Sequence, residues 1–467
     1  MRVLSFSRFA TWVRVSHAEH PHRLRAAFVA ALAVVVVLMS IKYAGKIAKP
    51  SETGLQSRSA FLRWRPMVNG VFAGENIYVD RNEYPNPPVM ALVLRPFTAL
   101  PPVTGALAWF YAKVLLAVLA AVWAFRLCRA EPTPGRGGSA LRLDLAKAAA
   151  VVLCLPALLG DLSHGNVNIF ILFLVAGCLE AFRRRLDTLA GLTLALAIAC
   201  KVTPLLFVAY FAWKRCWRLL AATLVGLALW LAVVPGLVFG WDRNRELIGD
   251  WYALMVERPL LKGEITTEHP NQAITGFVYR LFTHSPSYIE YVKTPEGDIP
   301  TPGEYHNLAD IGRPAAWVVV KALTALFALA VVVLCRARVR APADPREGWR
   351  VAAECGLICL GMLLFSERTW KHHAVVLLLP LAALCYAVAV VDLPRRARNF
   401  ILGVLVASLV LTAGPGLLAG RAADLTMVYG THTVAFVLEA VAIGVLLACR
   451  SDRVCGSREA GGETFPV

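Results

Sequence analysis

The chain has 467 residues, of which 58% are hydrophobic and 17% are charged, and its mean hydropathy is +0.59. This composition excludes an ordinary soluble globular protein and indicates a polytopic membrane protein. The formal net charge of +17 does not indicate binding to nucleic acid, because the arginines and lysines fall in short clusters between apolar runs. The eleven cysteines show no CxxC or Cys/His spacing, so we expect no metal site, no disulfide framework and no cofactor.

Apolar runs recur along the whole chain. The first, about 26–43, follows arginines and is too long for a cleaved signal peptide, so we interpret it as a retained signal anchor. Runs long enough to cross a bilayer, the shortest of them marginally, lie near 26–43, 103–126, 144–160, 167–182, 217–239, 314–335, 351–365, 373–391, 399–419 and 432–449. Two shorter runs between 188 and 213 are separated by Lys201-Val202-Thr203-Pro204, which predicts a helical hairpin. The sequence therefore predicts an all-α polytopic fold with about twelve transmembrane helices.

Arginine clusters in alternate short loops predict the orientation. They lie at 126–136, 183–185, 214–218, 336–340 and 395–398. By the positive-inside rule these loops and both termini lie in the cytoplasm. We expect the protein itself to lie in the cell (inner) membrane. The long polar loops at about 45–87 and 240–313, together with the turns at 161–166, 201–204, 366–372 and 420–431, then face outside the cytoplasm.

We expect a single transmembrane domain over residues 1–450, followed by a disordered cytoplasmic tail at 451–467. The first outer loop, 45–102, ends in an apolar stretch from Val89 to Leu100 that is too short to span and has prolines at both ends. This stretch predicts a short interfacial or re-entrant helix. The second long outer loop covers 240–313.

The polar segment from Ser366 to His373 packs five ionisable side chains and a tryptophan between two apolar runs. Such charges are tolerated near a membrane only when they are paired, hydrated or bound to a ligand. Arg368, His372 and His373 can all donate hydrogen bonds to phosphate oxygens, which favours an anion site. A basic anchor at the membrane interface is the alternative.

A second polar segment runs from Gly160 to Asn168. Asp161, His164, Asn166 and Asn168 together favour a site that holds a sugar or supplies a base. Helix capping by a serine or asparagine is the alternative, although capping explains only part of the set.

Two further candidates lie in the hairpin and at the end of the first outer loop. Lys201 either extends to the interface or binds a lipid phosphate. Asp80 and Tyr84, with Glu75 and Glu83 beside them, suit a sugar-binding lid, with a structural turn as the alternative.

Several motifs in order resemble glycosyltransferase family 87. They are Tyr84-Pro85-Asn86-Pro87-Pro88, Gly165-Asn166-Val167-Asn168, Ala190-Gly191 through Lys201-Val202-Thr203-Pro204, Trp213-Lys214-Arg215-Cys216-Trp217-Arg218, Asn271-Gln272-Ala273-Ile274-Thr275-Gly276 and the segment 366–373. The resemblance runs from about residue 74 to 380. The family comprises bacterial polyprenol-phosphate-mannose-dependent mannosyltransferases and their relatives with the C-type membrane fold.

The resemblance implies transfer of a sugar, by default mannose, from a polyprenyl phosphate sugar to an outer glycan or glycolipid acceptor, with inversion. The partners are then the lipid-linked donor, the acceptor and membrane lipids. For this chemistry the sequence offers three groups of candidate residues: Asp80, Asp161 and His164 for catalysis, Lys201, Arg368, His372 and His373 for the donor phosphate, and Tyr84, Asn166, Asn168, Asn271 and Gln272 for substrate binding.

One position departs from the family pattern. The family carries an aspartate, regarded as the base, about fourteen residues before the glycine that corresponds to Gly74, and here that position is Ala60. Either Asp80, Glu75 or Glu83 replaces it, or Asp161 with His164 does so, or the chain has lost this chemistry. A transporter or lipid flippase is the rival class, with Glu439 in the last apolar run as its best residue.

Overall fold

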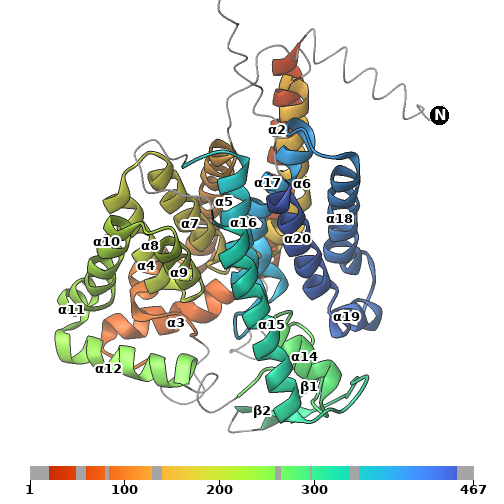
Figure 1. The fold of residues 1–467 in the computed structure, drawn as a ribbon. Helices are drawn as coiled ribbons and strands as arrows, with labels where there is room; N and C mark the ends of the chain where they lie inside the picture. The colour runs from red at the N-terminus through yellow and green to blue at the C-terminus, as the bar shows by residue number, and fades with distance from the viewer. Residues whose placement is uncertain are drawn as a thin grey trace, which may run out of the picture.

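Helices build almost the whole of the described chain (Figure 1). The computed structural model describes residues 20–48, 59–78, 84–128, 139–257, 264–294, 297–336 and 346–449. The first half contains α2 (Pro21–Ile47), α3 (Ala60–Ala73), α4 (Pro88–Thr98), α5 (Pro102–Leu127), α6 (Ser139–His164), α7 (Asn168–Arg183), α8 (Asp187–Cys200), η1 (Thr203–Leu205), α9 (Leu206–Trp213), α10 (Trp217–Ala228), η2 (Leu229–Val233) and α11 (Val234–Phe239). The second half contains α12 (Trp241–Tyr252), η3 (Ala253–Glu257), α14 (Ile274–Phe282), β1 (Ile289–Thr294), β2 (Gly297–Pro302), α15 (Arg313–Leu334), α16 (Trp349–Leu364), η4 (Lys371–Leu377), α17 (Leu378–Val390), α18 (Arg395–Ala413), η5 (Gly414–Leu417), α19 (Arg421–Val428) and α20 (Thr431–Ala448).

The predicted all-helical polytopic architecture is confirmed. Within the described residues, eight helices are long and apolar enough to cross a membrane: α2, α5, α6, the α10–α11 segment, α15, the η4–α17 segment, α18 with η5, and α20. The other predicted spans are shorter helices, because α7 and α16 have 16 residues each and the hairpin consists of α8, η1 and α9. A small antiparallel sheet pairs β1 with β2 in the second long loop, with Ile289 opposite Pro302.

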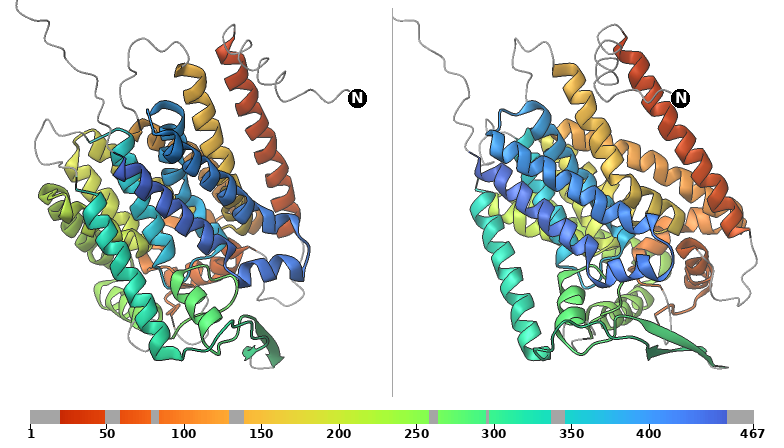
Figure 2. Two further views of the ribbon diagram at one scale, coloured as in Figure 1. Left: turned by 45° about the vertical axis from the view of Figure 1, so that its right-hand side comes forward. Right: turned by 90° about the vertical axis from the view of Figure 1, so that its right-hand side faces the viewer.

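The polar segments gather at one end of the helical bundle. Figures 1 and 2 show α3, α12, α14, the β1–β2 hairpin and α19 at this end, which we call the polar-loop end. The opposite end, the arginine end, carries ion pairs of Glu180 with Arg183 and Arg184, and of Arg346 with Asp187. Among the described residues, the arginine clusters at 183–185, 214–218 and 395–398 therefore lie at the end opposite α12, α14 and the β1–β2 hairpin.

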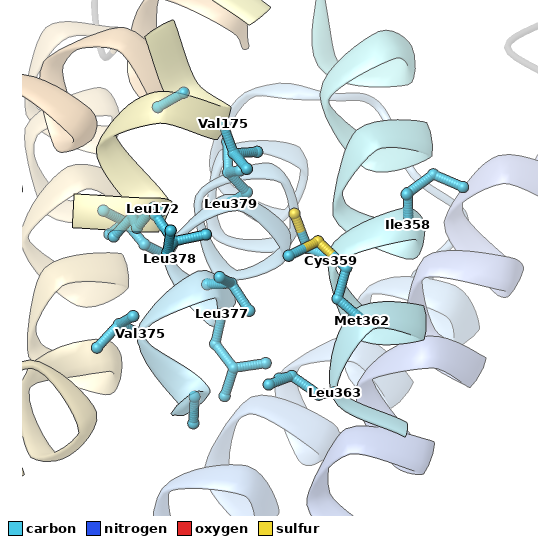
Figure 3. Packing of buried hydrophobic residues seen from close by; sticks show 14 of the residues in the cluster. Leu172, Val175, Ile358, Cys359, Met362, Leu363, Val375, Leu377, Leu378 and Leu379 are labelled. Atoms are coloured by element: carbon cyan, nitrogen blue, oxygen red, sulfur yellow. The ribbon is translucent and has the colours of Figure 1, made fainter. Parts of the chain in front are cut away.

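The centre of the bundle is formed by α16 and α17. Every residue from Val351 to Leu364 is buried. Figure 3 shows Met362 and Leu363 of α16, Leu377 and the α7 residue Leu172 within one cluster of buried apolar side chains. The peripheral helices α2 and α15 instead expose most of their apolar side chains. This arrangement suits a membrane, where lipid covers the outer apolar surface while helices pack through close contact.

Helix α6 continues to His164, so most of the predicted turn at 161–166 is helical. Gly165, the residue after the helix, has a φ of +73°. Its N–H donates to the Asp161 carbonyl at 3.0 Å and so caps the C-terminus of α6. A residue with a side chain would adopt this left-handed conformation only with strain. Asp161 and His164 consequently lie in the last turn of a helix, and the break is confined to 165–167.

Helices α8 and α10 pack closely through Gly191, where a Cβ atom would lie 2.7 Å from Ala222 Cβ and would also meet the Leu219 carbonyl. We predict that Gly191→Val separates the helices and lowers stability by about 1–3 kcal/mol, the usual cost of overpacking. The melting temperature of the purified protein in detergent measures this loss. Gly403→Val in α18 is the matched control, because a Cβ there meets nothing within 4 Å; equal melting temperatures for the two variants would contradict the predicted contact.

Candidate active site

Seven of the residues singled out in the sequence come together where α6 ends, α7 begins, α8 turns into η1, and η4 starts. They are Asp161, His164, Asn166, Asn168, Lys201, His372 and His373. Segments far apart in the sequence therefore form one polar cluster; Asn166 and His372, which are in contact, are 206 positions apart.

A buried ion pair lies at the base of the cluster. Lys113 of α5 and Asp161 of α6 both have fully buried side chains, with 3.0 Å between Lys113 Nζ and Asp161 Oδ2. Lys113 Nζ also donates to the Asp161 carbonyl at 2.8 Å. Charges inside a helical bundle are retained only when they are paired and hydrogen-bonded, which both groups are here.

Asn168 connects this ion pair to Lys201. Asp161 Oδ1 accepts from the Asn168 backbone N–H at 3.3 Å and from Asn168 Nδ2 at 3.0 Å. On its other side Asn168 Oδ1 accepts from Lys201 Nζ at 2.5 Å. Burial lowers the pKa of Lys201 to about 8, and the charge of Asp161 opposes this shift. The ammonium form still dominates at neutral pH.

Three histidines line the other side of the cluster. The rings of His164 and His372 stack at 4.4 Å, and His372 lies edge-on to His373 at 4.9 Å. Asn166 Nδ2 lies 3.2 Å from His372 Nε2, and the Trp370 N–H donates to His373 Nδ1 at 3.4 Å. Within the described part of the chain, the His164 ring has no hydrogen-bond partner, so it is free to exchange a proton with a ligand.

A small pocket opens beside Lys201. Its polar wall consists of Asn168, Lys201, Thr203, Ser366, Thr369 and His373, and its apolar wall of Ile171, Met362, Leu363 and Val376. A pocket with a cationic wall and an apolar wall suits an anion attached to a hydrocarbon chain, because each part of such a ligand meets a matching surface.

Positive charge dominates the electrostatics of the cluster. Lys46 donates to the Ser163 carbonyl at 2.9 Å, and the charges of Lys46, Arg63 and Lys113 all act on His164, opposed by the charge of Asp161. Within the described residues, no group of three His, Cys, Asp or Glu side chains is arranged to hold a metal ion. The chemistry that this arrangement favours is therefore anion binding beside an imidazole.

Asn271 and Gln272 have a different environment from the one the sequence suggested, because both are fully buried. Asn271 Nδ2 donates to the Thr266 and Glu367 carbonyls at 2.8 and 3.1 Å, while its Oδ1 accepts from the Ala273 and Thr369 N–H groups at 3.0 Å each.

Gln272 Nε2 donates to the His269 and Met427 carbonyls at 2.7 and 2.8 Å. Its backbone N–H donates to the Thr369 carbonyl at 2.6 Å. Both residues thus hold the turn before His372 in place.

The remaining predicted residues are not part of the cluster. Tyr84 is fully buried and packs edge-on against Trp64 at 5.8 Å. The Arg368 side chain is half exposed and its Nε lies 2.9 Å from Glu367 Oε1. Burial raises the pKa of Glu367, and Arg368 opposes this. Ala60 is buried in the first turn of α3, and Asp80 lies outside the described residues.

Sequence reasoning missed two cations that organise the site. Lys113 is the charged residue within the apolar run 103–125, and a charge inside a span is itself a signal of function. Arg280 of α14 is fully buried. Its guanidinium donates to backbone carbonyls of Thr267, Glu268, Asn271, Met427 and Val428. No local pattern in the sequence indicates this second role.

The fold and the cluster define a polytopic membrane protein with a cationic pocket at one end of its helices. The model of glycosyltransferase family 87 matches residues 84–366, more than half of the chain, and the chain belongs to this family. Two curated relatives carry the name polyprenol-phosphate-mannose-dependent alpha-(1-2)-phosphatidylinositol mannoside mannosyltransferase. The protein from Mycobacterium tuberculosis is 26% identical over 68% of this chain and 66% of its own length. The protein from Mycolicibacterium smegmatis is 26% identical over 62% of this chain and 59% of its own length.

The match therefore spans slightly less than two thirds of each relative. Among solved structures, the chain is similar to ArnT from Cupriavidus metallidurans in the apo state, with a TM-score of 0.39 and 14% identity over 91% of this chain and 78% of that one. The same protein bound to undecaprenyl phosphate gives a TM-score of 0.38 and 12% identity over 90% of this chain and 78% of that one.

We predict that Asn271→Ala lowers stability by about 1–3 kcal/mol for each buried partner left without a hydrogen bond, and that it also displaces the turn before His372. The melting temperature measures the first effect and protection of Trp370 fluorescence from a soluble quencher measures the second. Asn307→Ala is the control, because among the described residues the half-buried Asn307 side chain bonds only the carbonyl of Ala309, two residues away. A melting temperature for Asn271→Ala equal to that of the control would contradict the positioning role.

Proposed function

We propose that this protein is a membrane glycosyltransferase that moves a sugar from a polyprenyl phosphate sugar to a hydroxyl of a glycan or glycolipid, with inversion. The observation that carries the proposal is the pocket whose lining combines Lys201 and His373 with the apolar side chains of Ile171, Met362, Leu363 and Val376. A phosphate joined to a polyprenyl chain matches both walls. The names of the curated relatives support mannose as the sugar.

The proposed reaction is a single displacement. The acceptor oxygen attacks C1 of the sugar, and the bond from C1 to the phosphate oxygen breaks with its electron pair moving to that oxygen. The acceptor proton passes to a base. Lys201 stabilises the departing phosphate as a cation, and the Ser366 and Thr369 hydroxyls and the His373 imidazole complete the pocket. In this proposal Arg368 breaks its ion pair with Glu367 and then binds the donor phosphate from the edge of the pocket.

The choice of base follows from the contacts of Asp161. Both of its carboxylate oxygens are occupied, one by Lys113 and the other by Asn168, and the side chain is fully buried. We therefore assign Asp161 a positioning role and propose His164, whose ring is free and only partly buried, as the base. Asp80 remains the carboxylate alternative from the first outer loop.

The proposed orientation places the polar-loop end outside the cytoplasm. Its basis is the separation of the arginine clusters from the long loops, combined with the positive-inside rule. The donor then enters the pocket from the outer leaflet, with its polyprenyl chain against the apolar wall.

The transporter alternative finds no specific support. Glu439, the residue that favoured it, is buried between helices and accepts a hydrogen bond from Ser408 of α18. This contact joins α18 to α20 through Glu439 Oε1, while Glu439 Oε2 is buried with no hydrogen-bond partner among the described residues.

Purified protein incubated with polyprenyl phosphate mannose and a glycolipid acceptor tests the function directly. Release of polyprenyl phosphate together with a mannosylated acceptor supports the proposal. The proposal fails if no polyprenyl phosphate sugar is consumed, and movement of intact donor across a liposome bilayer would instead favour the flippase class.

For the base, we predict that His164→Gln lowers turnover by about a hundredfold, the low end of general-base assistance, while the affinity for donor is retained. Asp80→Asn is measured in parallel as the competing assignment. His284→Gln is the matched control, because His284 is exposed and stacks on Tyr305 in the second long loop. If His164→Gln turns over normally, His164 is not the base. If Asp80→Asn is inactive in the same assay, Asp80 is assigned as the base instead.

For the orientation, we predict that Leu308→Cys reacts with a membrane-impermeant maleimide in intact cells and that Arg396→Cys does so only after lysis. Leu308 is 66% exposed at the polar-loop end, and Arg396 is exposed at the start of α18 at the arginine end. Labelling is measured above that of the unsubstituted protein. The reverse pattern would invert the topology and exclude an outer lipid-linked donor.

A further inference from the structure

We propose that the buried Lys113–Asp161 ion pair is a positioning device that acts through Asn168 to hold Lys201 in the donor-phosphate pocket. The inference rests on the proposed function, because it assigns to Lys201 the donor phosphate as ligand. It adds a role for Lys113, a residue outside the pocket that none of the sequence motifs contains.

The first step of the argument concerns the orientation of the Asn168 amide. An ionised carboxylate is only an acceptor, whereas the side chain of asparagine has a donor end and an acceptor end. Asp161 Oδ1 receives both the backbone N–H and Nδ2 of Asn168. The donor end of the amide must therefore face Asp161, and the acceptor end, Oδ1, must face away from it.

The second step concerns Lys201. Its ammonium is a donor without acceptor capacity, and it bonds the outward-facing Asn168 Oδ1 at 2.5 Å. If the amide were rotated by 180°, two donors would face each other and Lys201 would lose this contact. The orientation set by Asp161 thus decides whether the Lys201 ammonium stays at the wall of the pocket.

The third step concerns Lys113. Its side chain is fully buried in α5 and bonds both the carbonyl and the carboxylate of Asp161. Because Lys113 occupies Asp161 Oδ2, the other oxygen, Oδ1, is the one that faces the Asn168 amide. Without Lys113 the carboxylate would lose the bond that holds Oδ2, and Oδ1 would no longer be held opposite the Asn168 amide.

The variants Asp161→Asn and Asn168→Leu test the chain of contacts from its two ends. An asparagine at position 161 turns its carbonyl toward Lys113 and its amide NH₂ toward Asn168, which rotates the Asn168 amide and releases Lys201. Asn168→Leu removes the link and keeps the ion pair intact. Asn307→Leu at a half-buried loop position is the matched control for the second variant.

The double variant Lys113→Met with Asp161→Asn supplies a rescue that a general packing defect would not give. With no ammonium beside it, the asparagine at position 161 turns its carbonyl toward Asn168 and restores the original orientation of the amide. Replacing both members of a buried pair by neutral groups is also better tolerated than removing one of them.

The experiment measures binding of undecaprenyl monophosphate to the purified protein in detergent, with monodispersity on size exclusion as the check of folding. We expect Asp161→Asn and Asn168→Leu to weaken binding by about tenfold or more, the effect of losing a charge-assisted hydrogen bond. The double variant and Asn307→Leu should bind within about threefold of the unsubstituted protein. If Asp161→Asn is not folded, Asn168→Leu decides.

The pH dependence of the same binding gives a second readout. Lys201 has a pKa lowered by burial to about 8, and the charge of Asp161 raises it. His372 and His373 also face Lys201 from η4. Deprotonation of Lys201 removes its attraction for phosphate, so binding weakens as the pH rises through about 8, where the phosphate has already lost its second proton. In Asp161→Asn the weakening should begin at lower pH.

Normal affinity in Asn168→Leu would overturn the inference, and so would a double variant that binds as weakly as Asp161→Asn. These results are separate from the test of the function. Binding of undecaprenyl monophosphate without transfer from any donor sugar would defeat the proposed function and leave the positioning role standing. An unsubstituted protein that does not bind the probe would overturn the phosphate pocket itself.

Discussion

A carboxylate buried among apolar helices must be neutralised, and the way Asp161 meets this requirement organises the whole site. Its partner Lys113 comes from α5, and its second contact, Asn168, begins α7. One acid therefore joins three helices at the polar-loop end. Removing one member of such a pair leaves an uncompensated charge, a cost of about 3–5 kcal/mol. The position of Lys201 depends on this arrangement because its hydrogen bond to Asn168 is the last in the chain of contacts.

A second buried cation fixes the opposite wall of the site by a different route. Arg280 bonds backbone carbonyls from the loop before α14 and from the end of α19. Asn271 and Gln272 extend this network to the turn before His372. Because these partners are main-chain groups, the network specifies the path of the backbone before His372.

The pocket lies where these two networks meet the rigid core. The apolar part of its lining comes from Ile171 of α7, Met362 and Leu363 of α16, and Val376 of η4. Apolar side chains lining the same pocket as a hydrogen-bonded cation give a ligand two surfaces of different character. For an amphiphilic anion this reduces the cost of ordering the site on binding, because little of the wall has to move.

The sequence alone determined the helical architecture, the hairpin around Lys201 and the family, because hydropathy, periodicity and motif order are local properties. It also predicted that His164, Lys201 and His372 lie at the same end of the molecule, because successive loops between transmembrane helices lie alternately at the two ends. Only the tertiary structure decided what each of these residues contacts. Asp161 looked like a free base in sequence, yet its partner Lys113 lies 48 residues away. The sequence indicated Asn271 and Gln272 as substrate ligands, whereas in the structure their side chains are hydrogen-bonded to backbone groups. Pairing between distant segments depends on how helices pack, and no local pattern contains that information.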